Sequence, residues 1–174
     1  MSTNATPSDP STNGKPLLEI KGLKKYFPVK GGVFLRTKAQ LKAVDDVSLF
    51  IKPGETLGLV GESGCGKSTL GKCVCRLHDV TDGNIHFRGD DITRLHRKAL
   101  KPYRRDIQMI FQDPAESLNS RHSVGNILEE PLLIHGVKDP RERRQRVAKI
   151  LDTVGLPSDS VHRFPFEFSG GQRQ

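Results

Sequence analysis

The sequence predicts an α/β fold in which a strand–loop–helix unit lies between a β-rich region and a helical region. The central observation is the run Gly61-Glu62-Ser63-Gly64-Cys65-Gly66-Lys67-Ser68-Thr69, which follows the apolar residues 56–60. Before this run, short apolar segments alternate with glycine and proline turns, as strands do. After residue 113, apolar residues recur at helical spacing.

The first elements are expected to be strands. Residues 1–16 are rich in Ser, Thr, Asn, Pro and Gly and predict a disordered tail. Strands are then predicted at residues 17–23, 41–51 and 56–60, with a polar loop at residues 31–40. Pro53-Gly54 is the turn before the third strand. This β region and the first part of the nucleotide-binding core are assigned to residues 17–113.

The later elements change from strand to helix. A helix is expected from Lys67, followed by a turn at residues 81–84 and strands at residues 85–88 and 107–111. Helices are predicted at residues 124–133 and 141–154, the second opened by Asp139-Pro140 and stopped by Gly155. A helical subdomain therefore occupies residues 114–174.

Composition narrows the possible partners. The 174 residues carry a net charge of +8 with no Trp and two Tyr. The basic residues are spread over residues 21–30, 94–105 and 141–149, so we expect no direct nucleic-acid contact.

No apolar run approaches the ~20 residues that span a bilayer, which predicts a cytoplasmic protein. Cys65, Cys73 and Cys75 form no metal-ligand pattern, and we interpret Cys73 and Cys75 as packing residues.

The glycine-rich run has the chemistry of a phosphate-binding loop. Gly61, Gly64 and Gly66 allow positive φ angles and let backbone N–H groups approach a polyphosphate. Lys67 supplies a positive charge for the β- and γ-phosphates, and the Ser68 hydroxyl can bind Mg²⁺. Thr69 is expected to donate near the α-phosphate. The alternative is an ordinary glycine turn with a solvated lysine.

A second glycine-rich motif lies near the end of the chain, at Phe168-Ser169-Gly170-Gly171-Gln172. A hydroxyl and two unhindered backbone N–H groups at the start of a helix can bind an anion. Alone, the motif could equally be a flexible turn. Because one ATP does not need two such loops from one subunit, the pair predicts a composite site.

In the order of these motifs the chain resembles the ATP-binding subunits of ABC transporters, over residues 17–174. The resemblance implies an ABC-type P-loop NTPase fold with an antiparallel β subdomain and a helical subdomain. It assigns residues 61–69 to the phosphate loop, Gln112 to the Q-loop and residues 169–172 to the signature motif. Lys67 and Gln112 are then the catalytic candidates, and Ser68 and Gln112 the Mg²⁺ contacts.

The resemblance also implies an aromatic residue that stacks on adenine, at Phe27 or at the adjacent Tyr26. A core residue at the end of a strand is the other interpretation of Phe27.

Finer features are similar to the dipeptide and oligopeptide importer branch of the family. These features are Cys65, residues 111–114 with Ser117-Leu118-Asn119, residues 127–132 and the insertion at residues 28–40. Ser120 and Phe168 depart from the pattern of that branch.

The family mechanism implies two subunits that pack head to tail and enclose ATP and Mg²⁺. It also implies membrane-spanning transporter subunits as partners, which places the chain at the cytoplasmic face of the cell membrane. A non-transport ABC-type ATPase acting on nucleic acid or the ribosome is the alternative function. A small-molecule kinase is a third, which the motif at residues 169–172 disfavours.

One family element is missing from the sequence. The resemblance implies an apolar strand that ends in Asp-Glu and carries the catalytic glutamate, but Glu129, Glu130 and Glu167 do not follow such a run. We therefore expect a fragment that ends just after the signature motif, lacks the C-terminal part of the core, binds ATP weakly and does not hydrolyse it. Uncovered apolar faces also predict poor solubility.

Overall fold

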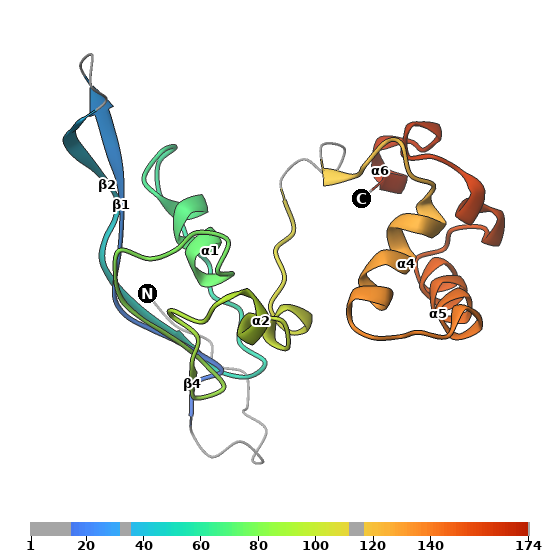
Figure 1. Cartoon of the computed structure of the whole chain (residues 1–174), viewed down its shortest axis with the longest axis horizontal. Helices are drawn as coiled ribbons and strands as arrows, with labels where there is room; N and C mark the ends of the chain where they lie inside the picture. The colour runs from blue at the N-terminus through green and yellow to red at the C-terminus, as the bar shows by residue number, and fades with distance from the viewer. Residues whose placement is uncertain (1–14, 32–35, 112–116, 174) are drawn as a thin grey trace, which may run out of the picture. The chain divides into compact units, whose positions relative to one another are not determined.

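The computed structural model describes residues 15–31, 36–111 and 117–173. It contains two compact units, Met1–Met109 and Ile110–Gln174, which are described separately (Figure 1). The predicted tail at residues 1–16 lies almost wholly outside the described residues, as do Gln112 and the expected boundary at residue 113.

The first unit is built on an antiparallel sheet with the strand order β2-β1-β3-β4. Its strands are β1 (Leu18–Gly31), β2 (Arg36–Ile51), β3 (Asp82–Phe87) and β4 (Asp90–Asp91). Each strand pairs antiparallel with its neighbour, which confirms the predicted antiparallel subdomain.

One face of this sheet packs against helix α1 (Lys67–Val74). Ile20 and Ile85 are opposite each other on β1 and β3, and both are almost completely buried. Leu70 and Cys73 supply the buried side chains of α1. Cys73 therefore packs in the core, as expected. The short α2 (Arg97–Leu100) and the 3-10 turn η1 (Tyr103–Arg105) follow the sheet.

Two predicted boundaries in the sheet are wrong. Residues 36–40 were expected in a polar loop, but they belong to β2, where Gln40 pairs with Pro28 and Ala39 with Val29. Residues 82–84 were expected in a turn, but Asn84 pairs with Lys21 in β3. Polar residues can extend a hairpin because hydrogen bonds to the partner strand require only the backbone.

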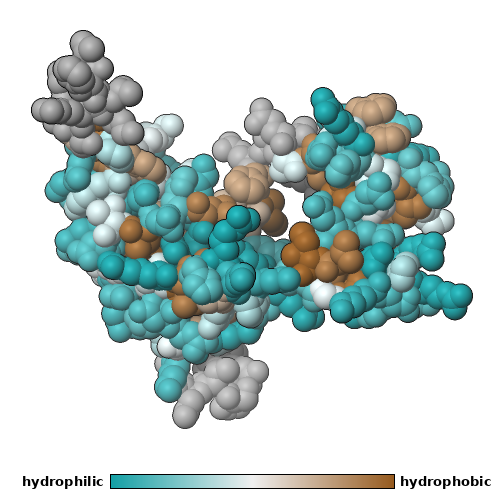
Figure 2. Space-filling model, viewed as in Figure 1, coloured by the Kyte–Doolittle hydropathy of each residue, from teal (hydrophilic) through white to brown (hydrophobic). Residues whose placement is uncertain are grey.

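The two predicted strands at residues 56–60 and 107–111 are also absent from the described sheet. Among the described residues, no strand pairs with either segment. Several of their apolar side chains are exposed, with Val60 95% and Ile110 96% exposed, whereas Ile107 is partly buried against the core. Figure 2 shows hydrophobic residues at the surface of this view. An apolar run forms a strand only where a neighbouring backbone completes its hydrogen bonds.

The second unit is helical, as predicted. It contains α4 (Val124–Ile134), α5 (Pro140–Thr153), the 3-10 turns η2 (Ser158–His162) and η3 (Pro165–Glu167), and α6 (Gly170–Arg173). The Asp139 carboxylate accepts from the Arg141 N–H over 2.9 Å and caps α5. Gly155, with φ +73°, follows the end of the helix. Within the described ranges, none of the helices is long and apolar enough to cross a membrane.

Candidate functional site

The glycine-rich loop meets α1 at Gly66, and Lys67 is the first helical residue, as predicted. Gly66 has φ +98°, and a Cβ there would lie 2.1 Å from the Ala43 carbonyl oxygen of β2. Glycine is the residue type that tolerates both the left-handed backbone and this close approach. The loop is thus held directly against the sheet.

The first turn of α1 presents backbone donors. The helical hydrogen bonds begin at Leu70, whose N–H donates to the Gly66 carbonyl over 2.8 Å. The N–H groups of Lys67, Ser68 and Thr69 have no acceptor among the described residues. Unpaired N–H groups at the positive end of the helix dipole are the arrangement that binds phosphate.

Lys67 turns its ammonium group towards the loop. Its Nζ donates to the Gly61 carbonyl over 2.7 Å and to the Glu62 carbonyl, and lies 3.4 Å from the Cys65 sulfur. A phosphate group that entered the loop would offer this ammonium charged oxygen acceptors in place of neutral carbonyls. The loop therefore combines a positive charge with N–H donors that have no acceptor among the described residues, and this combination fits a polyphosphate.

The two candidate adenine-stacking residues lie on β1 with different partners. The Phe27 ring meets His78 edge-on at 5.6 Å, and Lys25 Nζ is 4.8 Å from the Phe27 ring centroid. The Tyr26 hydroxyl donates to Asp45, which raises the pKa of Tyr26. Neither ring is fully buried, so the assignment of the stacking residue to Phe27 or Tyr26 stays a prediction.

The second motif lies in the second unit, where Ser169 precedes α6. The Ser169 N–H donates to Gln172 Oε1 over 3.0 Å, and the Gln172 N–H donates to the Ser169 hydroxyl oxygen over 3.4 Å. This reciprocal pair is a capping box. A Cβ at Gly170 or Gly171 would meet no atom within 4 Å, so both backbones are open to an approaching group.

Sequence reasoning missed the contacts that hold α1 in place. Arg104 donates to the carbonyls of Cys75 and Arg76, at the far end of the helix from the loop. Arg76 in turn donates from Nε to the Ile92 carbonyl over 3.0 Å. No motif predicts these contacts, because they join segments that are distant in sequence.

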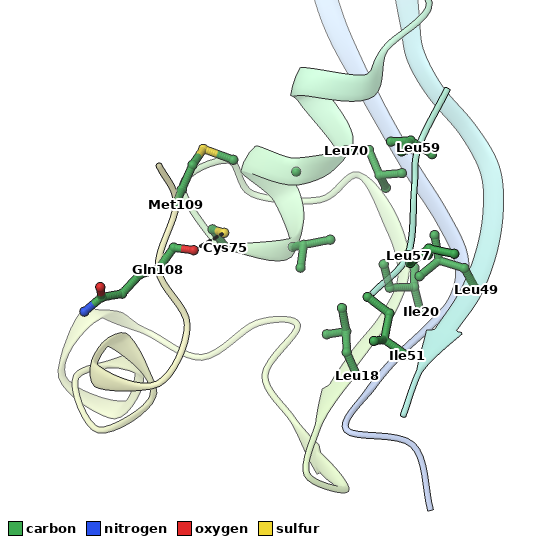
Figure 3. Close-up of a pocket in the computed structure, with 12 residues that line it drawn as sticks. Leu18, Ile20, Leu49, Ile51, Leu57, Leu59, Leu70, Cys75, Gln108 and Met109 are labelled. Atoms are coloured by element: carbon green, nitrogen blue, oxygen red, sulfur yellow. Dashed lines mark hydrogen bonds between the residues drawn. The ribbon is translucent and has the colours of Figure 1, made fainter. Parts of the chain in front are cut away.

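An apolar cavity of about 300 Å³ lies beside α1 (Figure 3). Leu57 and Leu59 line it together with residues of the sheet and of α1, and its lining includes none of residues 61–69. Its chemistry suits apolar side chains rather than a nucleotide phosphate.

The chain matches the model of the ABC transporter family from residue 44 to residue 174. It is 48% identical to the oligopeptide transport ATP-binding protein AppF of Bacillus subtilis, over 94% of this chain and 50% of that protein. It is 45% identical to the dipeptide transport ATP-binding protein DppF of Haemophilus influenzae, over 91% of this chain and 48% of that protein. The chain thus spans about half the length of these curated relatives.

Solved structures show the same fold. The ATP-binding cassette MJ0796 in a dimeric post-hydrolysis state bound to ADP and Pi matches with a TM-score of 0.72 and 27% identity, over 90% of this chain and 65% of that chain. A second dimeric structure of MJ0796 gives a TM-score of 0.74 over the same shares. The phosphate loop, the signature motif and these matches together show that the chain belongs to the ABC transporter family and resembles its oligopeptide and dipeptide ATP-binding branch.

Proposed function

We propose that this chain provides the ATP-binding half-site of a peptide importer. The observation that carries the proposal is the first turn of α1, where the N–H groups of residues 67–69 have no acceptor among the described residues and the Lys67 ammonium donates to loop carbonyls. The relatives' names, which describe oligopeptide and dipeptide transport, support peptides as the transported class.

Phosphate binding tests this half-site. Lys67→Ala should weaken ATP binding at least about tenfold, a loss of about 1.4 kcal/mol, because a charge-assisted contact to phosphate disappears. The matched control is Lys72→Ala, which removes another lysine of the same helix. Titration calorimetry on residues 1–174 gives both dissociation constants, and equal weakening by the two variants would contradict the proposal.

Mg²⁺ would join the site through Ser68, with Gln112 reaching the metal or the attacking water. The Ser68 hydroxyl has no side-chain partner among the described residues, which leaves it open to a metal ligand role. Bound Mg²⁺ would neutralise charge on the phosphates. Removing Mg²⁺ with EDTA should weaken ATP binding in the wild type and have a smaller effect in Ser68→Ala.

A second ATP-binding subunit would complete the site. In this proposal the residues Ser169, Gly170, Gly171 and Gln172 of one subunit meet the ATP held by the phosphate loop of the other. The open backbone at Gly170 and Gly171 and the dimeric MJ0796 structures support this arrangement. Sedimentation with ATP and Mg²⁺ tests it, since Ser169→Arg should abolish any ATP-dependent dimer and leave ATP binding by the single subunit intact.

The membrane-spanning subunits would hold the complex at the cytoplasmic face of the cell membrane. Loss of labelled dipeptide or oligopeptide uptake in cells that carry Lys67→Ala in the full-length gene would support the importer function. Unchanged uptake would contradict it.

We also propose that residues 1–174 alone bind ATP and do not hydrolyse it. The acidic residues Glu129, Glu130 and Glu167 do not lie at the end of an apolar strand, where a catalytic carboxylate is needed. A steady ATP turnover by purified residues 1–174 that Lys67→Ala abolishes would overturn this point.

A further inference from the structure

The turn that follows α1 is held by an arginine from outside the helix. The helix ends at Val74 with Cys75 as its C-cap, and the carbonyls of Gly71, Lys72 and Cys73 accept from N–H groups of residues 75–78. Arg104 of η1 donates from Nη2 to the Arg76 carbonyl over 2.7 Å and from Nη1 to the Cys75 carbonyl. One planar guanidinium thus binds the carbonyls of the C-cap residue and of the residue after it, just past the negative end of the helix dipole.

Arg104 is itself on an anchored segment. The hydroxyl of its neighbour Tyr103 donates to Asp90 over 3.0 Å, and the Tyr103 ring meets Phe87 edge-on at 6.4 Å. Two residues after Arg104, Asp106 forms an ion pair with Arg88 over 2.7 Å. These contacts fix η1 to the β3–β4 hairpin, so Arg104 ties the end of α1 to the sheet.

The other end of α1 is also fixed. At Gly66 the backbone approaches the Ala43 carbonyl so closely that a Cβ has no room. The eight residues of α1 span about 12 Å. If the C-terminal end of the helix is released from Arg104, the helix can tilt about its close contact at Gly66, and this tilt changes the direction of the N–H groups of Lys67, Ser68 and Thr69.

We infer that Arg104 is a positioning residue for the phosphate loop. It holds α1 where the N–H groups of Lys67, Ser68 and Thr69 converge on a phosphate, without touching the nucleotide itself. This inference rests on the proposed ATP binding. It adds a residue that is 37 positions from Lys67 in sequence and contributes through the orientation of the helix.

The test compares ATP and pyrophosphate binding in four proteins: the wild type, Arg104→Met, Arg104→Lys and Arg105→Met. Arg105 is the matched control, since it is the adjacent residue of η1 and its side chain is exposed. Arg104→Met should bind both ligands about tenfold more weakly. Arg104→Lys, which keeps the charge but reaches fewer carbonyls, should fall between wild type and Arg104→Met, and Arg105→Met should match the wild type.

Calorimetry at low temperature, with circular dichroism to confirm folding, separates positioning from stability. If Arg104→Met melts at a lower temperature but binds both ligands as the wild type does, Arg104 only stabilises the fold and the inference is overturned. Weaker ATP binding with unchanged pyrophosphate binding would also overturn it, because the loop contacts only phosphate. If Arg104→Met does not fold, the ATP and pyrophosphate affinities of Arg104→Lys, compared with those of the wild type, test the inference by the same criteria. If the wild type binds neither ATP nor pyrophosphate, the proposed ATP binding is wrong, and the inference about Arg104 is wrong with it.

Discussion

Gly66 is the residue at which the loop depends most on the absence of a side chain. Gly66→Ala combines a φ of +98° with a Cβ placed 2.1 Å from the Ala43 oxygen, so the loop or β2 must move. We expect at least about 2 kcal/mol of destabilisation and loss of ATP binding. Urea denaturation and calorimetry measure these two effects.

Gly64→Ala is the matched control for this prediction. Gly64 also has a positive φ, +82°, but a Cβ there meets nothing within 4 Å. The loss of stability should then be limited to the cost of a left-handed alanine, about 1 kcal/mol. Equal losses of stability in the two variants would show that the contact with Ala43 is unimportant.

Cys65 is the thiol that should report on the loop. It is exposed, whereas Cys73 is buried and Cys75 half-buried, and burial raises the pKa of both of those thiols. N-ethylmaleimide should therefore modify Cys65 first, and ATP should slow the reaction because the Cys65 sulfur lies 3.4 Å from Lys67 Nζ. Peptide mass spectrometry identifies the site, with Cys65→Ser as the control. First labelling at Cys73, or no protection by ATP, would contradict this prediction.

The helices and strands show which signals in the sequence are sufficient to predict an element and its ends. Helix α5 was predictable because its start and stop are local: Asp139 caps it, Pro140 opens it and Gly155 follows its end. The segment at residues 56–60 carries an equally clear apolar pattern, but a strand also requires a neighbouring backbone. The hairpin of β1 and β2 extends through polar residues for the same reason, since pairing rather than composition decides where a strand ends.

The turn between α4 and α5 depends on Arg143, whose side chain is only 14% exposed. It donates from Nε to Glu129 Oε2 over 3.0 Å and from Nη1 to the carbonyls of Val137 and Lys138 over 3.1 and 2.8 Å. Arg143→Met leaves these acceptors unpaired and should destabilise the helix pair by about 1–3 kcal/mol. Hydrogen exchange in peptides from residues 124–138 should become faster.

The adjacent arginine supplies the control for Arg143. Arg144 has an exposed side chain, so Arg144→Met should leave exchange in the same peptides unchanged. If both variants accelerate exchange alike, the effect is the loss of charge from α5 rather than the loss of the Arg143 contacts.

At the scale of the whole molecule, the order of the motifs was sufficient to predict the family. The phosphate loop lies in the first unit and the signature residues in the second, and each motif opens a helix as expected. The contacts that place the loop were not predictable. The close contact between Gly66 and Ala43 joins residues 23 positions apart, and Arg104 lies 28 or more positions from the carbonyls to which it donates. No local pattern encodes such contacts.

The exposed apolar residues predict how residues 1–174 behave in solution. Val60 and Ile110 are 95% and 96% exposed, and Leu41 and Phe50 on β2 are more than half exposed. Burial of such surface between molecules is favourable by about 25 cal/mol per Å². We therefore expect concentration-dependent self-association in sedimentation velocity, reduced in the double variant Val60→Ser/Ile110→Ser. The control is Val154→Ser/Phe166→Ser, which removes two other exposed apolar side chains and tests whether residues 60 and 110 dominate the self-association. A monomer with a sharp cooperative melt at high concentration would contradict the prediction, because it would show that these side chains are covered in solution.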